Sequence, residues 1–278
     1  TKYYTLLQER SMRMPIKVIL TVAISAILVS CQTIHIPEAT LSDAFAGKDG
    51  TIVIIDCSSG AMSDFRPNES TEPLAPCSTF KIWNTLIGLE NGFINYPEEI
   101  FYKWDGKTRE IPEWNENLTL KKAFQVSCVP AFQDLARRIG AERMQFWLDK
   151  INYGNRDISA GIDVFWLPAQ GRTTLLITPE QQTWLMYKLI SGKLPFSEKS
   201  RIVLKNIMKA KETDHGTLYG KTGSGTYNNG SSSLGWYVGY VESKGRTYAF
   251  ACTVKGDHLM GKDARTIVET IFTKNGFL

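Results

Sequence analysis

The sequence predicts an α+β fold with two lobes, one built on an antiparallel sheet with flanking helices and the other mainly helical. Three observations support this prediction: a strand-like segment near the start, patterns of helical period through the middle, and strand-like segments followed by a helical pattern in the last third. The simplest packing joins the strands of both ends in one sheet and leaves the helical middle beside it.

The first expected strand runs from Thr51 to Asp56, and a Ser-Ser-Gly turn follows it. Apolar residues then recur at helical spacing from Ile82 to Leu89, until Asn91-Gly92 ends the pattern. Three further helices are expected, over 130–138, from a capped start at 178–181, and over 197–210.

The last third is rich in Tyr, Trp, Val and Phe, separated by Gly, Ser and Asn. Residues 217–221, 234–242 and 246–255 read as strands, and the tight connection over 242–246 suggests an antiparallel hairpin. A final helix is expected over about 262–273. No internal repeat or low-complexity linker argues for independent domains.

The chain is expected to carry one catalytic domain over 51–278, preceded by a leader in 1–30 and a short mature segment over 31–50. A basic start is followed by an apolar run over 18–29, which is too short to span a membrane and typical of a signal peptide. The run ends at Leu-Val-Ser-Cys31, which resembles the site where bacterial lipoproteins are cleaved and acylated. We therefore expect export and a lipid on Cys31; a secretory signal with an unrelated cysteine is the alternative.

Composition excludes some classes of function. The formal charge of +4 comes mostly from the leader, since residues 31–278 hold 28 basic and 27 acidic residues. A nearly neutral body gives no reason to expect binding of nucleic acid. Apart from Cys31, the cysteines show no metal-ligand spacing, and the chain has only three histidines. A metal site is therefore not expected. Export permits disulfides, but the sequence leaves the pairing open for Cys57, Cys77, Cys128 and Cys252.

Ser78 and Lys81 form the first motif that points to chemistry. On a helix, residues i and i+3 share a face with about 5–6 Å between their Cβ atoms, so the amine can reach the hydroxyl. The positive end of the helix dipole near Ser78 favours an oxyanion, and the apolar neighbours of Lys81 lower its pKa toward that of a usable base. A Ser-x-x-Lys quartet also occurs by chance, with both side chains facing water.

Lys221-Thr222-Gly223, on an expected strand, is the second motif, and Ser224 follows it. Gly223 would let a ligand approach the backbone, a free strand edge would bind an amide, and Lys221 with Thr222 would hold a carboxylate. The same three residues are also common in ordinary turns that bind no ligand.

The third motif, Ser127-Cys-Val129, lies at a junction of two helical patterns, where a serine is a helix cap or a proton relay. Together the three motifs resemble the serine penicillin-recognising enzymes. Class A β-lactamases and penicillin-binding proteins carry Asn at the third position, whereas Val129 is apolar. With Tyr153-Gly-Asn155, Phe165-Trp166-Leu167 and Trp104, this pattern resembles the class D, oxacillinase-type β-lactamases from about residue 50 onward.

The resemblance implies that Ser78 is the acylated nucleophile and that Lys81 is the general base, carried as an N-carboxylated lysine formed with carbon dioxide. It implies that Trp166 donates its indole N–H to the carboxylated lysine, while Val129 replaces an amide that would solvate a cation. Tyr153-Gly-Asn155 would shape the neighbouring loop or be a plain turn.

The resemblance also assigns substrate contacts. The backbone amides of Ser78 and Ser224 would form the oxyanion hole. The carboxylate of the substrate would bind Lys221, Thr222 and Arg265, although a basic residue near the start of a terminal helix is often only solvated. Gly223, Ser224 and Trp104 would complete the binding site.

The sequence thus indicates an exported, lipid-anchored, periplasmic class D β-lactamase that needs no metal or cofactor beyond carbon dioxide. Its partner is a small β-lactam substrate, with no nucleic acid. The alternative is a β-lactam sensor or penicillin-binding protein that acylates with little turnover; a non-enzymatic lipoprotein is more remote. The range of β-lactams and the choice between monomer and homodimer stay open.

Overall fold

The computed structural model describes residues 36–94, 98–172, 174–227 and 230–278. The predicted signal peptide in 1–30 and the predicted lipidation site Cys31 lie outside these residues. Within the described part of the chain, no helix is both long enough and apolar enough to cross a bilayer.

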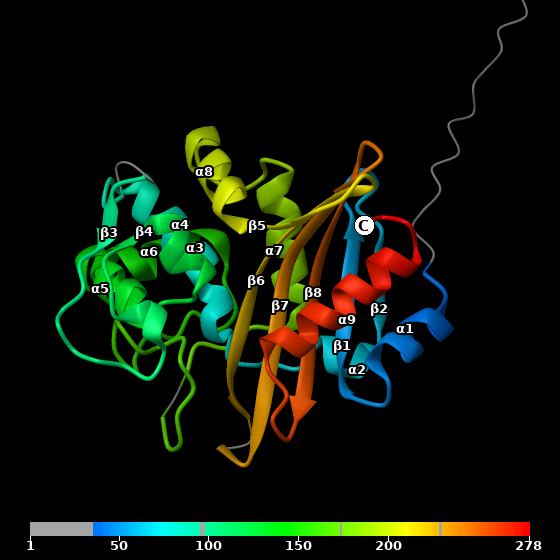
Figure 1. Cartoon of the computed structure of the whole chain (residues 1–278), viewed down its shortest axis with the longest axis horizontal. Helices are drawn as coiled ribbons and strands as arrows, with labels where there is room; N and C mark the ends of the chain where they lie inside the picture. Colours follow the sequence, from blue (N-terminus) through cyan, green and yellow to red (C-terminus); the bar gives the residue numbers. More distant parts are fainter. Residues whose placement is uncertain (1–35, 95–97, 173, 228–229) are drawn as a thin grey trace, which may run out of the picture. The chain divides into compact units, whose positions relative to one another are not determined.

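One antiparallel sheet contains strands from both ends of the described chain, in the order β2-β1-β8-β7-β6-β5 (Figure 1). In the middle of the β1–β8 pair, Ile52 lies opposite Cys252, so the N-terminal strand pairs directly with a C-terminal one. This confirms the predicted joining of the two ends. The strands are β1 Asp49–Asp56, β2 Met62–Phe65, β5 Lys209–Glu212, β6 Gly216–Tyr227, β7 Ser232–Ser243 and β8 Arg246–Gly256.

The predicted hairpin joins β7 to β8. Ser243 pairs with Arg246, and the two residues between them, Lys244 and Gly245, both have positive φ angles (50° and 75°). Two such residues make the tight turn whose twist matches antiparallel strands.

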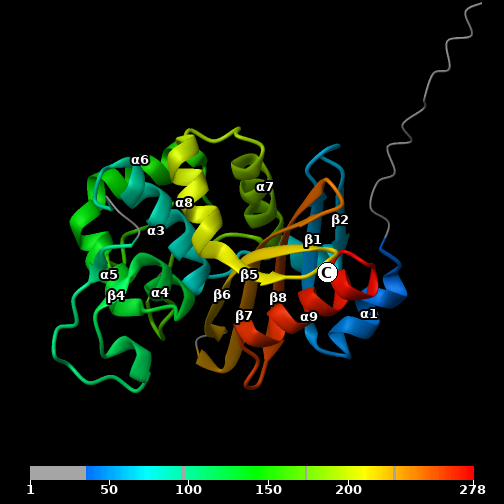
Figure 2. The ribbon, with the colours of Figure 1, turned by 45° about the horizontal axis from the view of Figure 1, so that its top comes forward.

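Helices cover both faces of the sheet (Figures 1 and 2). α1 (Glu38–Phe45) and α9 (Gly261–Lys274) pack against one face, and α7 (Pro179–Ile190) packs against the other. α1 lies in the segment predicted to precede the domain, and its Leu41 and Phe45 join the same apolar core as α9. α7 begins with the predicted cap, since Thr178 Oγ1 accepts a hydrogen bond from the Gln181 amide at 3.0 Å.

The middle of the chain forms the predicted helical lobe beside the sheet (Figure 1). Its apolar core is continuous with the inner face of the sheet, where Trp236 and Val238 are buried. The other elements of the described chain are α2 Pro67–Ser70, η1 Cys77–Phe80 (a 3₁₀ turn), α3 Lys81–Glu90, β3 Ile100–Tyr102, η2 Pro112–Trp114, β4 Leu118–Thr119, α4 Leu120–Gln125, α5 Val129–Ile139, α6 Ala141–Ile151 and α8 Glu198–Met208.

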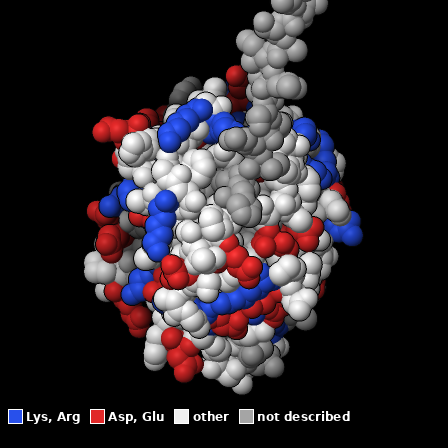
Figure 3. All heavy atoms as spheres, turned by 90° about the vertical axis from the view of Figure 1, so that its right-hand side faces the viewer, with Lys and Arg blue, Asp and Glu red and all other residues white. Residues whose placement is uncertain are grey.

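Charge is mixed on the face of the molecule shown in Figure 3, where Lys and Arg alternate with Asp and Glu. No extended area of one sign covers that face.

Candidate active site

Ser78 and Lys81 lie where the 3₁₀ turn η1 passes directly into α3. The Lys81 Nζ atom donates a hydrogen bond to Ser78 Oγ at 2.7 Å. The lysine is fully buried, and the serine is 9% exposed. The i, i+3 spacing thus brings the amine to the hydroxyl, with a narrow opening to solvent at the serine.

Burial is the main influence on the amine of Lys81. Removing the ammonium from water lowers the pKa of Lys81 from 10.5 to about 7, while negative charge on Cys128 or Cys77 would act in the opposite direction. Burial also raises the pKa of the Cys77 thiol to about 12, and it raises the pKa of the Cys128 thiol. Both thiols are therefore neutral near pH 7, and Lys81 is available there as a neutral amine.

The backbone is strained at two positions beside these groups. Cys77, directly before Ser78, has φ 51°, and Ser127 has φ 55°. Neither is glycine, and a left-handed conformation costs such a residue about 1–3 kcal/mol. Strain of this kind is typical of sites where the direction of a side chain matters, and here it fixes the directions of two serines.

A second buried lysine links the two lobes. Lys221 Nζ, on β6, donates to Ser127 Oγ at 3.0 Å and to the Thr222 carbonyl at 2.9 Å. Ser127 lies between α4 and α5, and the cap of α5 is Cys128, so Ser127 is not the cap of that helix. Burial, together with the charge of Lys81, lowers the pKa of Lys221 well below its ordinary value.

A pocket of about 250 Å³ opens beside these groups, and Lys221, Thr222, Gly220, Tyr237 and Arg265 line it together with Phe124, Gln125 and residues 207–210. The structure therefore brings Arg265 together with Lys221 and Thr222. The Arg265 guanidinium also forms an ion pair with Glu269, with 2.7 Å between Nε and Oε1. Its orientation is thus fixed within α9.

The outer edge of β6 is free at this point. β5 pairs only with Thr217, Leu218 and Tyr219 of β6, so the described residues from 220 onward have no strand partner on that side. A free strand edge was expected at this motif, and the register of β5 on β6 leaves one. The Ser224 hydroxyl is held in place because it accepts a hydrogen bond from the Gly261 amide at 3.0 Å.

Gly223 has a packing role in addition to the expected role in substrate binding. A Cβ there would lie 3.0 Å from Thr79 Cγ2 and 3.1 Å from the Pro76 carbonyl oxygen, and one at Gly225 would lie 2.6 Å from Cys77 Sγ. The two glycines therefore let η1 pack closely against β6. This close contact favours glycine at these positions.

Trp166 is buried, and its indole N–H has no hydrogen-bond partner among the described residues. Its ring stacks on Phe80 with 5.7 Å between centroids. Phe80 lies between Ser78 and Lys81 in the sequence and also packs edge-on against Tyr153. The indole N–H is thus a free donor among aromatic rings. Val129, the first residue of α5, is half-buried and offers no polar group.

Trp104 is the predicted site residue for which the structure gives least support. It is 39% exposed, and its indole N–H donates to the Lys107 carbonyl of its own loop at 2.9 Å.

The four cysteines whose pairing the sequence left open form no disulfide in the described part of the chain: Cys57, Cys77, Cys128 and Cys252 are all free.

Two polar residues near the site were not predicted. Gln182 of α7 donates to the buried Thr79 hydroxyl at 2.9 Å and so ties η1 to the sheet-side helix. Asn84 of α3 is fully buried one turn after Lys81. For Asn84 a signal was present, because it interrupts the apolar stripe of α3 three residues after Lys81.

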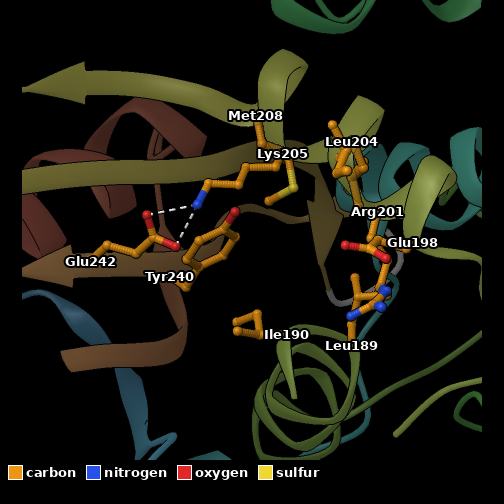
Figure 4. A pocket seen from close by; sticks show the side chains of 10 residues that line it. Leu189, Ile190, Glu198, Arg201, Leu204, Lys205, Met208, Tyr240 and Glu242 are labelled. Carbon is orange, nitrogen blue, oxygen red and sulfur yellow. Dashed lines mark hydrogen bonds and ion pairs between the residues drawn. The ribbon is translucent and has the colours of Figure 1, made fainter. Parts of the chain in front are cut away.

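A separate cavity lies between α7, α8 and β7 (Figure 4). Its apolar centre includes Ile190 and Tyr240, and at one end Lys205 pairs with Glu242 at 2.7 Å. Its lining residues include no serine, threonine or cysteine, so this cavity does not repeat the arrangement around Ser78.

Comparison with known proteins gives consistent matches. The family model described as the penicillin-binding protein transpeptidase domain matches residues 46–274. A probable β-lactamase from Bacillus subtilis, YbxI, is 35% identical over 245 residues, which is 88% of this chain and 88% of that protein. A solved class D β-lactamase from Bacillus subtilis is 35% identical, with a TM-score of 0.80 over 88% of this chain and 99% of the other.

A sensor domain matches as well. The C-terminal domain of the BlaR penicillin receptor of Bacillus licheniformis is 30% identical, with a TM-score of 0.78. The match covers 87% of this chain and 95% of that domain. The predicted fold is thereby confirmed as one that enzymes and sensors share.

The low pKa of Lys81 predicts how stability depends on pH. The unfolded chain binds the Lys81 proton more tightly than the folded protein does, so wild-type stability rises with pH between about 7 and 10.5. In carbon-dioxide-free buffer, Lys81→Met should raise the free energy of unfolding by roughly 5 kcal/mol at pH 6 and roughly 2 kcal/mol at pH 9. Urea unfolding measures both values, with Lys199→Met, on the exposed side of α8, as control. An equal gain at both pH values would contradict the assignment.

Proposed function

This chain belongs to the class D β-lactamases of the penicillin-binding transpeptidase family, and we propose that it hydrolyses β-lactams through an acyl-enzyme on Ser78. The observation that carries the proposal is the 2.7 Å hydrogen bond between Lys81 Nζ and Ser78 Oγ, in a site where burial lowers the pKa of the amine to about 7. A base carried by Lys81 at this position, which we propose is its carboxylated form, can take the serine proton, and the resulting alkoxide can attack a carbonyl carbon.

The oxyanion that forms in this attack needs donors that are already in place. We assign this role to the backbone N–H groups of Ser78 and Ser224. Support comes from the close packing of η1 on β6 at Gly223 and Gly225, which brings the two segments together. The Ser224 side chain is engaged with Gly261, so it does not compete for the site.

The substrate carboxylate would bind at Lys221, Thr222 and Arg265, which line one pocket; the Arg265 guanidinium supplies positive charge, and Lys221 and Thr222 supply hydrogen-bond donors. The free edge of β6 beside Gly223 would accept the substrate amide as an added strand. Trp104 would contact the substrate side chain, an assignment that rests on the class D resemblance of its motif.

Ring opening breaks the bond between the lactam carbonyl carbon and nitrogen, and the leaving nitrogen must gain a proton. Ser127 accepts a hydrogen bond from Lys221, which leaves its own O–H free to donate. We assign the proton delivery to Ser127, and Lys221 would replace that proton when it is in its ammonium form, which burial makes more acidic.

Hydrolysis of the acyl-enzyme requires a base that activates water. The residues fit a carboxylated Lys81: the amine is neutral, Val129 offers no competing amide, and the unpartnered Trp166 N–H is a donor for an anion. When bound, the carboxyl group derived from carbon dioxide supplies this general base. Trp166 would hold it, and the aromatic rings around Phe80 would exclude bulk water.

A β-lactam sensor is the second candidate, since the BlaR penicillin-receptor domain shares the fold at 30% identity. A sensor would form the same acyl-enzyme on Ser78 and retain it. The apolar Val129 and the unpartnered Trp166 donor favour turnover, because both suit a carboxylated lysine.

Export and lipid anchoring complete the proposal. The apolar run over 18–29 and the Leu-Val-Ser-Cys31 sequence support a lipoprotein. Gln32 rather than Asp follows the cysteine, which in a host with two membranes directs a lipoprotein to the outer one, facing the periplasm.

Removing the two central residues should separate acylation from turnover. Ser78→Ala should form no acyl-enzyme and show no turnover, because it lacks the attacking oxygen. Lys81→Ala should form the acyl-enzyme slowly at most and then retain it. Intact-mass spectrometry after addition of penicillin distinguishes the two variants, and Lys199→Ala serves as control. Normal turnover by Lys81→Ala would refute the assigned roles.

Turnover should depend on dissolved carbon dioxide. A carboxylated lysine forms only from the neutral amine, so activity should fall as the pH drops below about 7. In degassed buffer near neutral pH, the rate should also be low, and bicarbonate should restore it. Steady-state assays with and without bicarbonate test this. If bicarbonate has no effect at any pH between 5 and 8, Lys81 acts as a free amine.

The lipid anchor can be tested independently of catalysis. Wild-type protein should fractionate with membranes and incorporate labelled palmitate, because each buried CH₂ contributes about 0.8 kcal/mol and a bacterial lipoprotein carries several acyl chains. Cys31→Ser should remain uncleaved or be released in soluble form. Wild-type protein that is soluble, unlabelled and cleaved elsewhere would show that Cys31 has no such role.

A further inference from the structure

Asn84 is a second buried polar residue on the helix that carries Lys81. Its side chain is 0% exposed, and neither amide atom has a hydrogen-bond partner among the described residues. A buried amide without a partner is costly, and most buried polar groups in folded proteins have one. The position of Asn84 in the site therefore requires an explanation.

Asn84 lies on the stripe of α3 that faces α5. Lys81, Asn84 and Gly88 occupy positions i, i+3 and i+7 of this stripe. Lys81 Nζ lies 5.5 Å from the centroid of the Phe132 ring, and a Cβ at Gly88 would lie 3.0 Å from Leu135 Cδ1. Side chains on a helix lean toward its N-terminus, so the Asn84 amide reaches back toward the turn that carries Lys81.

The surroundings of this stripe are apolar apart from the site itself. The buried residues of α5 are Ala131, Phe132, Leu135, Ala136 and Ile139. On the other side, Phe80 precedes Asn84 by four residues and stacks on Trp166, whose indole N–H is also unpartnered. Among the contacts just described, the polar groups next to the stripe are thus the Lys81 amine and the Trp166 indole N–H.

We infer that Asn84 is a positioning residue for the carboxylated Lys81 side chain, to which it donates an amide N–H as Trp166 donates its indole N–H. This inference rests on the proposed function. A buried anion is stabilised by donors that point at it, and two neutral donors suit a group with two oxygens. Asn84 would thereby hold the carboxyl group in place and raise the affinity of Lys81 for carbon dioxide.

The indole N–H of Trp83, the residue before Asn84 on α3, is also unpartnered among the described residues, and it is not included. Trp83 packs against Tyr153 at 5.7 Å and Phe196 at 6.3 Å between ring centroids. It is two residues from Lys81, and therefore about 200° away around the helix. The Trp83 N–H accordingly lies on a different face of α3. The Tyr153 ring contacts both Trp83 and Phe80, with 5.4 Å between its centroid and that of Phe80.

The test uses Asn84→Leu, which keeps the branched shape of the side chain and removes the donor. With ¹³C-labelled bicarbonate, the carboxylated lysine of the wild-type protein should give a ¹³C resonance, and its intensity against bicarbonate concentration gives the dissociation constant. A hydrogen bond to a charged group predicts a constant about tenfold higher, or more, in the variant. The melting temperature in carbon-dioxide-free buffer should be unchanged or higher, because the variant buries no unpartnered amide.

Asn91→Ala is the matched control, since Asn91 lies at the C-terminal end of the same helix and donates to the Ile87 carbonyl. It should leave the constant unchanged. An unchanged or lower constant in Asn84→Leu would overturn the inference, as would a lower melting temperature or failure to fold, which would indicate a purely structural residue. If the wild-type protein itself gives no resonance, the carboxylated lysine of the proposed function fails, and the role of Asn84 fails with it.

Discussion

An ammonium ion loses its hydration when it is buried, and at Lys81 that loss, rather than a neighbouring charge, sets the pKa of the amine. The fold must therefore hold a long polar side chain inside an apolar lobe and aim its nitrogen at one hydroxyl. The continuous passage from η1 into α3 does this, because it places Ser78 and Lys81 on one face with 2.7 Å between Oγ and Nζ. Phe132 and the stacked pair of Phe80 and Trp166 keep the surroundings apolar.

The rest of the site depends on bringing the sheet close to this buried pair. Gly223 and Gly225 allow η1 to pack against β6, and the hydrogen bond from Lys221 to Ser127 links β6 to the junction of α4 and α5. A proton on Lys81 also disfavours one on Lys221, since both are buried and like charges repel. The proposed chemistry therefore needs both lobes: the helical lobe supplies the nucleophile and base, and the sheet supplies the groups that would bind the substrate.

The large elements and the three motifs could be predicted from the sequence because each has a local signal. The cap at Thr178, the Lys244-Gly245 turn and the spacing of Ser78 and Lys81 are all readable within a few residues. β2 was not predicted, because Met62–Phe65 is short, mixed in polarity and held by pairing with distant β1. α6 was missed although its apolar spacing is helical. The packing role of Gly223 could not be predicted, since it lies in a contact with η1 more than 140 residues away in the sequence.

The central claim is that burial makes Lys81 a neutral amine near pH 7, and its ionisation can be measured directly. Protein labelled with ¹³C at the lysine ε carbon can be titrated in carbon-dioxide-free buffer and followed by NMR, with the Lys81 resonance assigned by its absence from Lys81→Met. The account predicts that this resonance titrates with a midpoint near 7, while exposed lysines titrate near their ordinary value of about 10.4. A midpoint for Lys81 at the ordinary value would contradict the account.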